Sequence, residues 1–313
     1  MNIIETYNLK KSFKNITAVN DLNLTVNKGE MFGLVGPDGA GKTTTIRMLC
    51  GIMKPDGGKG LVLGNDIFTQ SELIKGKIGY LSQIFSLYQD LSIDENIDFI
   101  ADIHNVKNYS KLKDELLEFT RLTPFRDRLA GRLSGGMKQK LALACTLIHT
   151  PEILFLDEPT TGVDPISRRD FWNILSELLK QNVTIFMSTP YMDEAERCSR
   201  VGLMNIGKIM VCDTPENIKN SLNIKIFEIV CPDCRKTLSY AKSSGFISDA
   251  QLFGDKVHII PTDNNIDIIQ FKNNFNNQGI KIENIREISP SLEDIFISLI
   301  KENNIDKNDG KVT

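Results

Sequence analysis

A glycine-rich segment that could hold phosphate lies between an apolar run and a stretch with helical spacing. It fits the pattern G-x-x-x-x-G-K-[ST] and comprises Gly36, Pro37, Asp38, Gly39, Ala40, Gly41, Lys42, Thr43 and Thr44. The run Met31–Val35 predicts a buried strand before this loop, and 44–49 predicts a helix after it. Backbone N–H groups of such a loop approach phosphate closely, Lys42 reaches the β- and γ-phosphates, and the Thr43 hydroxyl suits Mg²⁺. The segment therefore predicts a nucleotide site with Mg²⁺.

Two carboxylates follow a second apolar run. Asp157 and Glu158 come directly after 153–156, which predicts another buried strand. An open parallel sheet binds its ligands at the carboxyl ends of its strands, so we expect these acids beside the phosphate loop. Asp157 is suited to hold Mg²⁺, usually through water, and Glu158 to polarise an attacking water as general base. Kinases, GTPases and many ATPases share these features, so the reaction stays open at this point.

The segment 133–139 narrows the choice. Its Ser134, Gly135 and Gly136 resemble the signature motif of ATP-binding cassette (ABC) proteins. In that family the serine, the glycines and a helix N-terminus grip the γ-phosphate of ATP bound to the other subunit of a head-to-tail dimer. Such a nest of backbone N–H groups completes a site elsewhere. The resemblance implies that a second cassette, either another copy or a distinct chain, is a partner.

Three further elements follow in the family's order, so the resemblance covers roughly residues 2 to 215. Gln83 matches the glutamine that contacts Mg²⁺ and water and senses the transmembrane partner. Phe13 stands where the family places an aromatic residue against adenine, and Asp164, in 161–164, matches the loop that couples the two sites across the dimer. The resemblance thus implies ATP and Mg²⁺ as cofactors and ATP hydrolysis coupled to transport.

One position departs from the family's pattern. In the context Ser-Thr-His-x-Met-x-Glu-Ala-Glu the family has a switch histidine, and this sequence has Pro190 there. Proline offers neither a side-chain donor nor a backbone N–H, and losing a preorganised donor costs on the order of 10²–10³ in rate. We predict that the chain's own site binds ATP and hydrolyses it slowly, while its signature motif completes a competent site on another cassette. Alternatively Thr189, Tyr191 or a water substitutes and the chain works as an ordinary homodimer.

A smaller departure is Asp38, where the family more often has asparagine. A negative charge that faced the phosphates would be unfavourable, so we expect this side chain to point away from them.

The patterns divide the chain into an α/β cassette and a smaller domain. Residues 1–218 are identified with a P-loop NTPase cassette that has a RecA-like core, an antiparallel β subdomain and a helical subdomain over about 85–147. Residues 219–303 predict a small α+β domain, with strands at 224–230, 256–260 and 280–288 and helices at 266–277 and 292–301. Residues 304–313, rich in Asn, Asp and Lys, are expected to be a flexible tail.

Composition limits the partners. The chain has 313 residues and a net charge of -3, which does not indicate a nucleic-acid partner. Its apolar runs fall far short of the roughly 20 residues of a membrane span, and no signal peptide is evident. As an ABC cassette it therefore requires a separate membrane permease, docked near Gln83 and the helical subdomain, and we expect it in the cytoplasm, peripheral on the inner face of the cell membrane.

The ending 289–296 resembles the close of C-terminal extensions in drug-exporter-like bacterial cassettes, which favours export. Two other classes stay open. One is a non-hydrolysing regulatory ABC subunit, which Pro190 allows. The other is a soluble ABC ATPase without a transport role, which normally carries a second cassette or a long coiled-coil insertion, and neither occurs in this sequence.

The six cysteines do not form the pattern of a disulfide framework, and we expect a reducing compartment. The pair Cys231 and Cys234, in Cys-Pro-Asp-Cys, could be half of a zinc site, but a structural zinc needs four ligands and no second Cys/His pair follows. The pattern favours ordinary thiols in a β-rich region, with metal or redox chemistry as the alternative.

Overall fold

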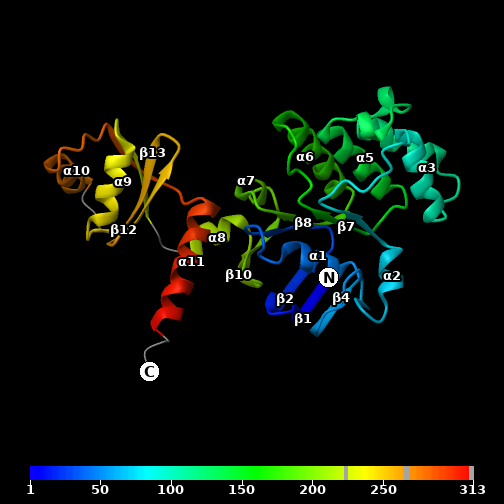
Figure 1. Cartoon of the computed structure of the whole chain (residues 1–313), viewed down its shortest axis with the longest axis horizontal. Coiled ribbons are helices and arrows are strands. Elements are labelled where there is room, and N and C mark those ends of the chain that lie inside the picture. The colour runs from blue at the N-terminus through cyan, green and yellow to red at the C-terminus, as the bar shows by residue number, and fades with distance from the viewer. Residues whose placement is uncertain (222–224, 264–267, 310–313) are drawn as a thin grey trace. The chain divides into compact units, whose positions relative to one another are not determined.

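The computed structural model describes residues 1–221, 225–263 and 268–309 (Figure 1). The chain divides into two compact units, Met1–Pro215 and Glu216–Thr313. The division falls at the start of helix α8 (Pro215–Ser221), whereas the sequence placed the boundary after residue 218.

The first unit is built on a six-stranded sheet. Its strands lie in the order β10 (Lys208–Asp213), β9 (Arg200–Asn205), β3 (Met31–Val35), β8 (Thr184–Thr189), β7 (Ile153–Asp157) and β6 (Ile78–Leu81). All neighbours pair in parallel except β10, which pairs antiparallel with β9. Strands β3, β7 and β8 are buried along their whole lengths, which explains their continuous apolar sequences. The predicted α/β core is confirmed.

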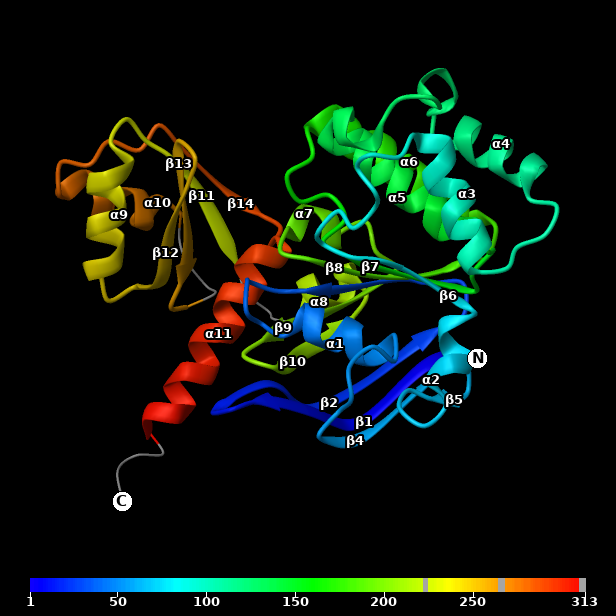
Figure 2. The ribbon, with the colours of Figure 1, turned by 45° about the vertical axis from the view of Figure 1, so that its right-hand side comes forward.

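A smaller antiparallel sheet has the order β2 (Ile16–Asn27), β1 (Asn2–Phe13), β4 (Gly57–Val62) and β5 (Asn65–Asp66), and the short helix α2 (Ser71–Lys75) follows β5. Helix α1 (Lys42–Leu49) lies between the two sheets (Figure 2). Its Ile46 and Leu49 belong to one apolar core with residues of both sheets, among them Ile4 and Phe155. This packing fixes the loop that precedes α1 against the carboxyl end of β3.

Helices α5 and α6 cover the opposite face of the six-stranded sheet, and α3 and α4 lie beyond α5 (Figure 2). The elements here are α3 (Ile93–Ile103), α4 (Ser110–Phe119), the 3-10 turns η1 (Thr123–Phe125) and η2 (Ala130–Arg132), α5 (Gly135–Leu147), α6 (Pro165–Lys180) and α7 (Met192–Ala195). The helical pattern expected from residue 85 becomes a helix only at Ile93. The reason is a capping box: Ser92 accepts from the Glu95 N–H and Glu95 accepts from the Ser92 N–H.

The second unit has the order β11 (Ile226–Val230), α9 (Cys234–Ser243), β12 (Ile247–Phe253), β13 (Lys256–Pro261), α10 (Ile268–Asn277) and β14 (Asn284–Ile288). Its antiparallel sheet has the order β12-β13-β11-β14, so the unit is a ferredoxin-like βαββαβ fold. Phe271 and Phe275 of α10 and Ala241 of α9 pack in one core with sheet residues such as Ile229 and Ile259. The sequence did not predict α9 or β12, and the strand predicted over 280–288 is confined to β14.

Helix α11 (Leu292–Asp309) follows the second sheet. Residues 304–309, which were expected to be a flexible tail, continue this helix, because extending a formed helix by one residue costs little once the first turns exist. The rest of the expected tail, 310–313, and the predicted strand and helix starts at 224 and 266–267 lie outside the described residues. Within 1–221, 225–263 and 268–309, no helix combines the length and the apolar character that crossing a membrane requires.

Candidate functional site

The phosphate loop joins β3 to α1 and needs its glycines. Gly41, the residue before α1, has φ 108°, and a Cβ there would stand 2.2 Å from the Ala18 carbonyl oxygen. A Cβ on Gly36 would stand 2.1 Å from the carbonyl oxygen of Met204. The loop backbone thus lies against neighbouring strands in a way no other residue permits, and the N-terminus of α1 at its end favours an anion.

A cavity of about 360 Å³ opens over this loop. It is lined by Phe13, Ala18, Asp38, Gly39, Gly41, Lys42, Thr43, Thr44, Gln83 and Glu158. The structure therefore brings the predicted adenine, phosphate and water-activating residues to one place. Gly36, Pro37 and Ala40 complete the loop behind them. Asp38, whose side chain was expected to point away from the phosphates, is one of the lining residues, and its exposed position lets solvent screen its charge.

The side chain of Lys42 lies folded onto its own loop. Its Nζ donates to the carbonyl oxygens of Gly36 at 2.8 Å and Pro37 at 3.1 Å, and it lies 3.1 Å from Oε1 of Glu158. Only 3% of Lys42 and 6% of Glu158 is exposed, so this ion pair is weakly screened. A phosphate that enters the loop must compete with these partners for the ammonium group.

Asp157 has oxygen atoms that could hold a metal. Its Oδ1 accepts from Thr43 Oγ1 at 3.0 Å and from Ser188 Oγ at 2.7 Å. Its Oδ2 is buried and has no hydrogen-bond partner among the described residues. A buried carboxylate oxygen without a partner, beside a threonine hydroxyl, is a hard oxygen donor of the kind Mg²⁺ prefers. Thr43, Asp157 and the nearby Gln83 therefore fit Mg²⁺.

Glu158 has an unusual backbone conformation. Its φ is 49°, in the left-handed region, and its N–H donates to both Oγ and the carbonyl oxygen of Ser188, at 3.1 and 3.2 Å. Its Oε2 accepts from Nε2 of Gln83 at 3.0 Å. Strain of this kind persists only where the surroundings impose it, and here it turns the carboxylate toward Gln83 and Lys42.

Two residues of this region were missed by the sequence interpretation. Ser188 pairs in register with Asp157 across β7 and β8, and its hydroxyl orients that carboxylate. Glu194, only 1% exposed, accepts from Thr160 at 2.5 Å and from Thr189 at 2.8 Å. Their positions depend on strand register and on the turn after β8, which the spacing of apolar residues does not reveal.

Pro190 lies at the end of β8, beside the phosphate loop. The preceding residue, Thr189, accepts a hydrogen bond from the Gly36 N–H at 3.3 Å. The Thr189 hydroxyl donates to Glu194, and the Tyr191 ring lies under the Arg168 guanidinium at 4.8 Å. The Thr189 hydroxyl is thus already engaged, whereas the contact of Tyr191 involves its ring and not its hydroxyl.

The signature residues lie outside the nucleotide cavity of their own chain. Ser134 caps α5 by accepting from the Met137 N–H at 3.3 Å, and Ser134 and Gly135 are exposed. Gly136 lies so close to α6 that a Cβ would stand 2.4 Å from the Ser167 side chain. The exposed part of this cluster, Ser134 and Gly135, is therefore not part of the cavity over the loop at 36–44.

Asp164 begins α6 as its N-cap and accepts from the N–H groups of Ser167 at 2.9 Å and Ile166 at 3.1 Å. These bonds, the one from Ser167 first, hold the pKa of Asp164 below its usual value, so it stays charged. The structure thus places the predicted coupling residue in the first turn of α6, the turn that also contains Ser167, against which Gly136 packs.

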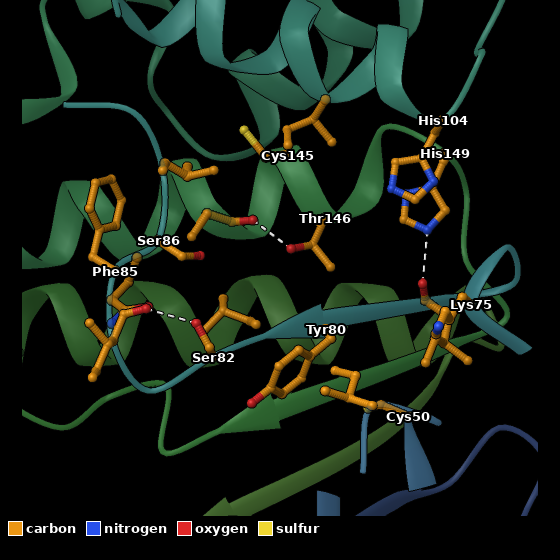
Figure 3. Close-up of a pocket in the computed structure, with 18 residues that line it drawn as sticks. Cys50, Lys75, Tyr80, Ser82, Phe85, Ser86, His104, Cys145, Thr146 and His149 are labelled. Carbon is orange, nitrogen blue, oxygen red and sulfur yellow. Dashed lines mark hydrogen bonds between the residues drawn. The ribbon is translucent and has the colours of Figure 1, made fainter. Parts of the chain in front are cut away.

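A second cavity, of about 310 Å³, separates the helical subdomain from strand β6 (Figure 3). Residues 84–87, which follow Gln83, form one end of it. At the other end His104 and His149 stack with ring centroids 4.0 Å apart and planes 3° from parallel. Burial lowers the pKa of both histidines.

The family model described as "ABC transporter" matches residues 19–161. The daunorubicin resistance ATP-binding protein DrrA2 of Streptomyces coeruleorubidus is 32% identical over 93% of this chain and 92% of its own length. The chain belongs to the ABC transporter ATP-binding proteins. This assignment confirms the predicted family.

Two other relatives are named for Nod factor export and for multidrug transport. The Nod factor export ATP-binding protein I of Rhizobium sp. (strain N33) is 35% identical over 95% of this chain and 96% of its own length. The probable multidrug ABC transporter ATP-binding protein YbhF of Escherichia coli (strain K12) is 41% identical over 95% of this chain, which spans only 52% of that protein. A solved nucleotide-free cassette of an ABC transporter superposes with a TM-score of 0.64 at 26% identity, over 70% of this chain and 94% of that one.

Proposed function

We propose that this ABC chain is the ATP-binding subunit of an exporter that drives a separate membrane permease. It binds ATP with Mg²⁺ in a head-to-tail pair with a second cassette, either another copy or a distinct chain, at the inner face of the cell membrane. The observation that carries this proposal is the split arrangement of one site: Lys42, Thr43 and Glu158 line one cavity, with Asp157 bonded to Thr43, while Ser134 and Gly135 lie exposed elsewhere.

Each residue at the cavity has a distinct task. Phe13 lies where an adenine can stack, and the loop N–H groups and Lys42 bind the phosphates once Lys42 leaves Glu158. Thr43, Asp157 and Gln83 hold Mg²⁺, which when bound offsets the charge on the phosphates. Glu158 then accepts the proton of the attacking water. The partner cassette's signature segment, which corresponds to the segment around Ser134 in this chain, supplies further N–H groups to the phosphates.

Two observations support a permease partner and an export direction. The names of two relatives refer to daunorubicin resistance and to Nod factor export. The 310 Å³ cavity lies between the β6 region and the helical subdomain and is continuous with the residues after Gln83. A segment of a permease seated there would be felt directly by Gln83, which contacts Glu158.

We further propose that this chain's own site hydrolyses ATP slowly because of Pro190. The Thr189 hydroxyl already donates to Glu194, and the Tyr191 ring packs against Arg168, which fixes where its hydroxyl can lie. A cassette that retains its histidine, completed by Ser134 of this chain, would then carry most of the turnover. A regulatory subunit that uses ATP only as a clamp is the second candidate, and Pro190 is also the observation that favours it.

ATP turnover by the purified chain and by Pro190→His tests this assignment. We expect the histidine to raise turnover by about 10²–10³, the effect of one preorganised donor, while ATP affinity stays similar. Pro190→Ala is the matched control, since it removes the ring without adding an imidazole, and it should show no such gain. Adding Glu158→Gln to Pro190→His should abolish the gain. Brisk turnover by the unaltered chain with no gain from histidine would refute slow hydrolysis.

The clamp is distinguished by measuring ATP binding and turnover on the same variants. If Pro190→His binds ATP and stays inactive even with a competent second cassette, the chain is a regulatory subunit. Expression together with the neighbouring membrane genes tests the permease, because a transport subunit should co-purify with an integral membrane protein and a soluble ABC ATPase should not.

A further inference from the structure

Two cysteines lie together in the second unit, where β11 passes into α9 (Figure 2). Cys231 follows the strand and Cys234 is the first residue of the helix, and their Sγ atoms are 3.5 Å apart. Asp233 caps the helix by accepting from the Lys236 N–H at 2.9 Å. The cap sets the turn that brings the two thiols together at the end of a strand, and Cys231 packs in one core with sheet residues such as Ile229 and Val257.

The two thiols differ in access and are both anchored. Cys231 is 7% exposed, whereas Cys234 is partly exposed and offers a route from solvent. The Cys234 thiol contacts the Asp255 carbonyl oxygen at 3.1 Å and the Cys231 carbonyl oxygen at 3.5 Å. The pair is therefore a preformed, solvent-accessible group of two sulfur atoms and not a pair of independent core thiols.

The surroundings argue against a spontaneous disulfide. A disulfide would need the sulfurs to close from 3.5 Å to about 2.05 Å. A soft cation displaces the thiol protons by direct coordination and needs no such approach.

The number of ligands selects the cation. Among the residues that the structure describes, no cluster of three or more His, Cys, Asp or Glu side chains could hold a metal. Structural zinc takes four ligands, so the pair is insufficient for it. Of the metals that prefer thiolates, Cu(I) is the soft, monovalent one, and it suits a small set of sulfur ligands.

We propose that Cys231 and Cys234 form a two-sulfur binding site for Cu(I) on the ferredoxin-like unit. As the two sulfur–copper bonds form, each thiol releases its proton to solvent, and copper stays Cu(I), so no oxidant or reductant takes part. The site lies in a different unit from the nucleotide cavity and does not depend on the proposed transport function. Copper would reach it through the exposed side of Cys234.

A competition titration of the full chain tests the site. The chain is purified without oxygen in the presence of a reductant and titrated against Cu(I) held by bicinchoninate, whose colour reports the copper it loses. We expect the chain to withdraw one Cu(I). The Cys231→Ser/Cys234→Ser variant should lose at least roughly 100-fold in affinity, because losing only a hydrogen-bond partner of a metal ligand can already cost that much. Cys212→Ser, which alters the other half-buried thiol, should bind as the unaltered chain does.

Two outcomes would overturn the proposal: no copper withdrawn by the unaltered chain, or equal withdrawal by the double variant. X-ray absorption of the copper-loaded unaltered chain needs no variant, and it should show two sulfur ligands; a nitrogen- or oxygen-ligated copper would also refute the site. ATP binding and thermal unfolding of the same preparations report separately on the nucleotide site and on folding.

Discussion

Nζ of Lys42 lies 3.1 Å from Oε1 of Glu158, and each of these side chains is less than one-tenth exposed. Lys42, proposed to bind phosphate, and Glu158, proposed to activate water, thus neutralise each other's charge. Gln83 completes the group through its 3.0 Å bond to Glu158. Entry of a nucleotide must exchange the ion pair for Lys42–phosphate contacts, which frees the Glu158 carboxylate for its proposed task.

The first prediction concerns the stability of this pair. Lys42→Ala leaves the buried Glu158 carboxylate without its cation, so the free energy of unfolding should fall by about 3–5 kcal/mol. The chain has one tryptophan, Trp172, which lies buried in α6 of the first unit. Its fluorescence during urea unfolding therefore reports the stability of the unit that holds the pair.

A double variant provides the control for that prediction. Glu158→Gln removes the charge but keeps an oxygen for Gln83, so Lys42→Ala should cost much less in its background. A full loss of stability for Lys42→Ala in both backgrounds would show that the ion pair is not responsible.

Glu158→Gln alone should also retain ATP binding while turnover falls by about 10²–10⁴, the contribution of a general base.

The second prediction concerns Mg²⁺. Asp157→Asn keeps the shape of the side chain and removes its charge from the partnerless Oδ2. We expect the affinity for ATP with Mg²⁺ to fall at least about tenfold, or about 1.4 kcal/mol, with little change for ATP in EDTA. Ser188→Ala is the comparison variant, because it loses the 2.7 Å bond that orients Asp157 and keeps the charge. An unchanged magnesium dependence in Asp157→Asn would contradict the assigned metal ligand.

The third prediction concerns Glu194, which holds the turn that contains Pro190. Glu194→Ala leaves the buried hydroxyls of Thr160 and Thr189 without their acceptor, and each unsatisfied group costs about 1–3 kcal/mol. The loss should appear in urea unfolding followed by Trp172. Glu194→Gln, which still accepts one of these bonds, should lose less. Equal losses for the two variants would mean that packing and not hydrogen bonding matters here.

The parts of the site that could be predicted from sequence are those in which a short segment carries its own chemistry. The phosphate loop is contiguous, and Asp157 and Glu158 follow a continuous apolar strand. The hydroxyl of Ser188 could not be found this way, because its role depends on the register between β7 and β8. Helix α9 was missed because its start is set by one capping residue, Asp233, and its apolar face is short.

The last prediction concerns pH. Burial lowers the pKa of His104 and His149, whose rings stack 4.0 Å apart in the groove that Lys75 also lines. An unfolded histidine has a pKa of about 6.5, so below this pH the unfolded chain binds protons that the folded groove resists. The stability of the first unit should therefore fall as the pH drops from about 6.5 through the lowered folded pKa values, and urea unfolding followed by Trp172 measures it.

Variants separate this effect from general acid destabilisation. In the unaltered chain the charge of His104 helps to lower the pKa of His149. His104→Gln removes both one titrating ring and this repulsion, so the free energy of unfolding should fall less between pH 6.5 and 5 than it does in the unaltered chain. His258→Gln alters the remaining histidine, in the second unit, and should leave the loss seen by Trp172 unchanged. If His104→Gln loses as much unfolding free energy in acid as the unaltered chain, the stacked histidines are not the cause of the loss.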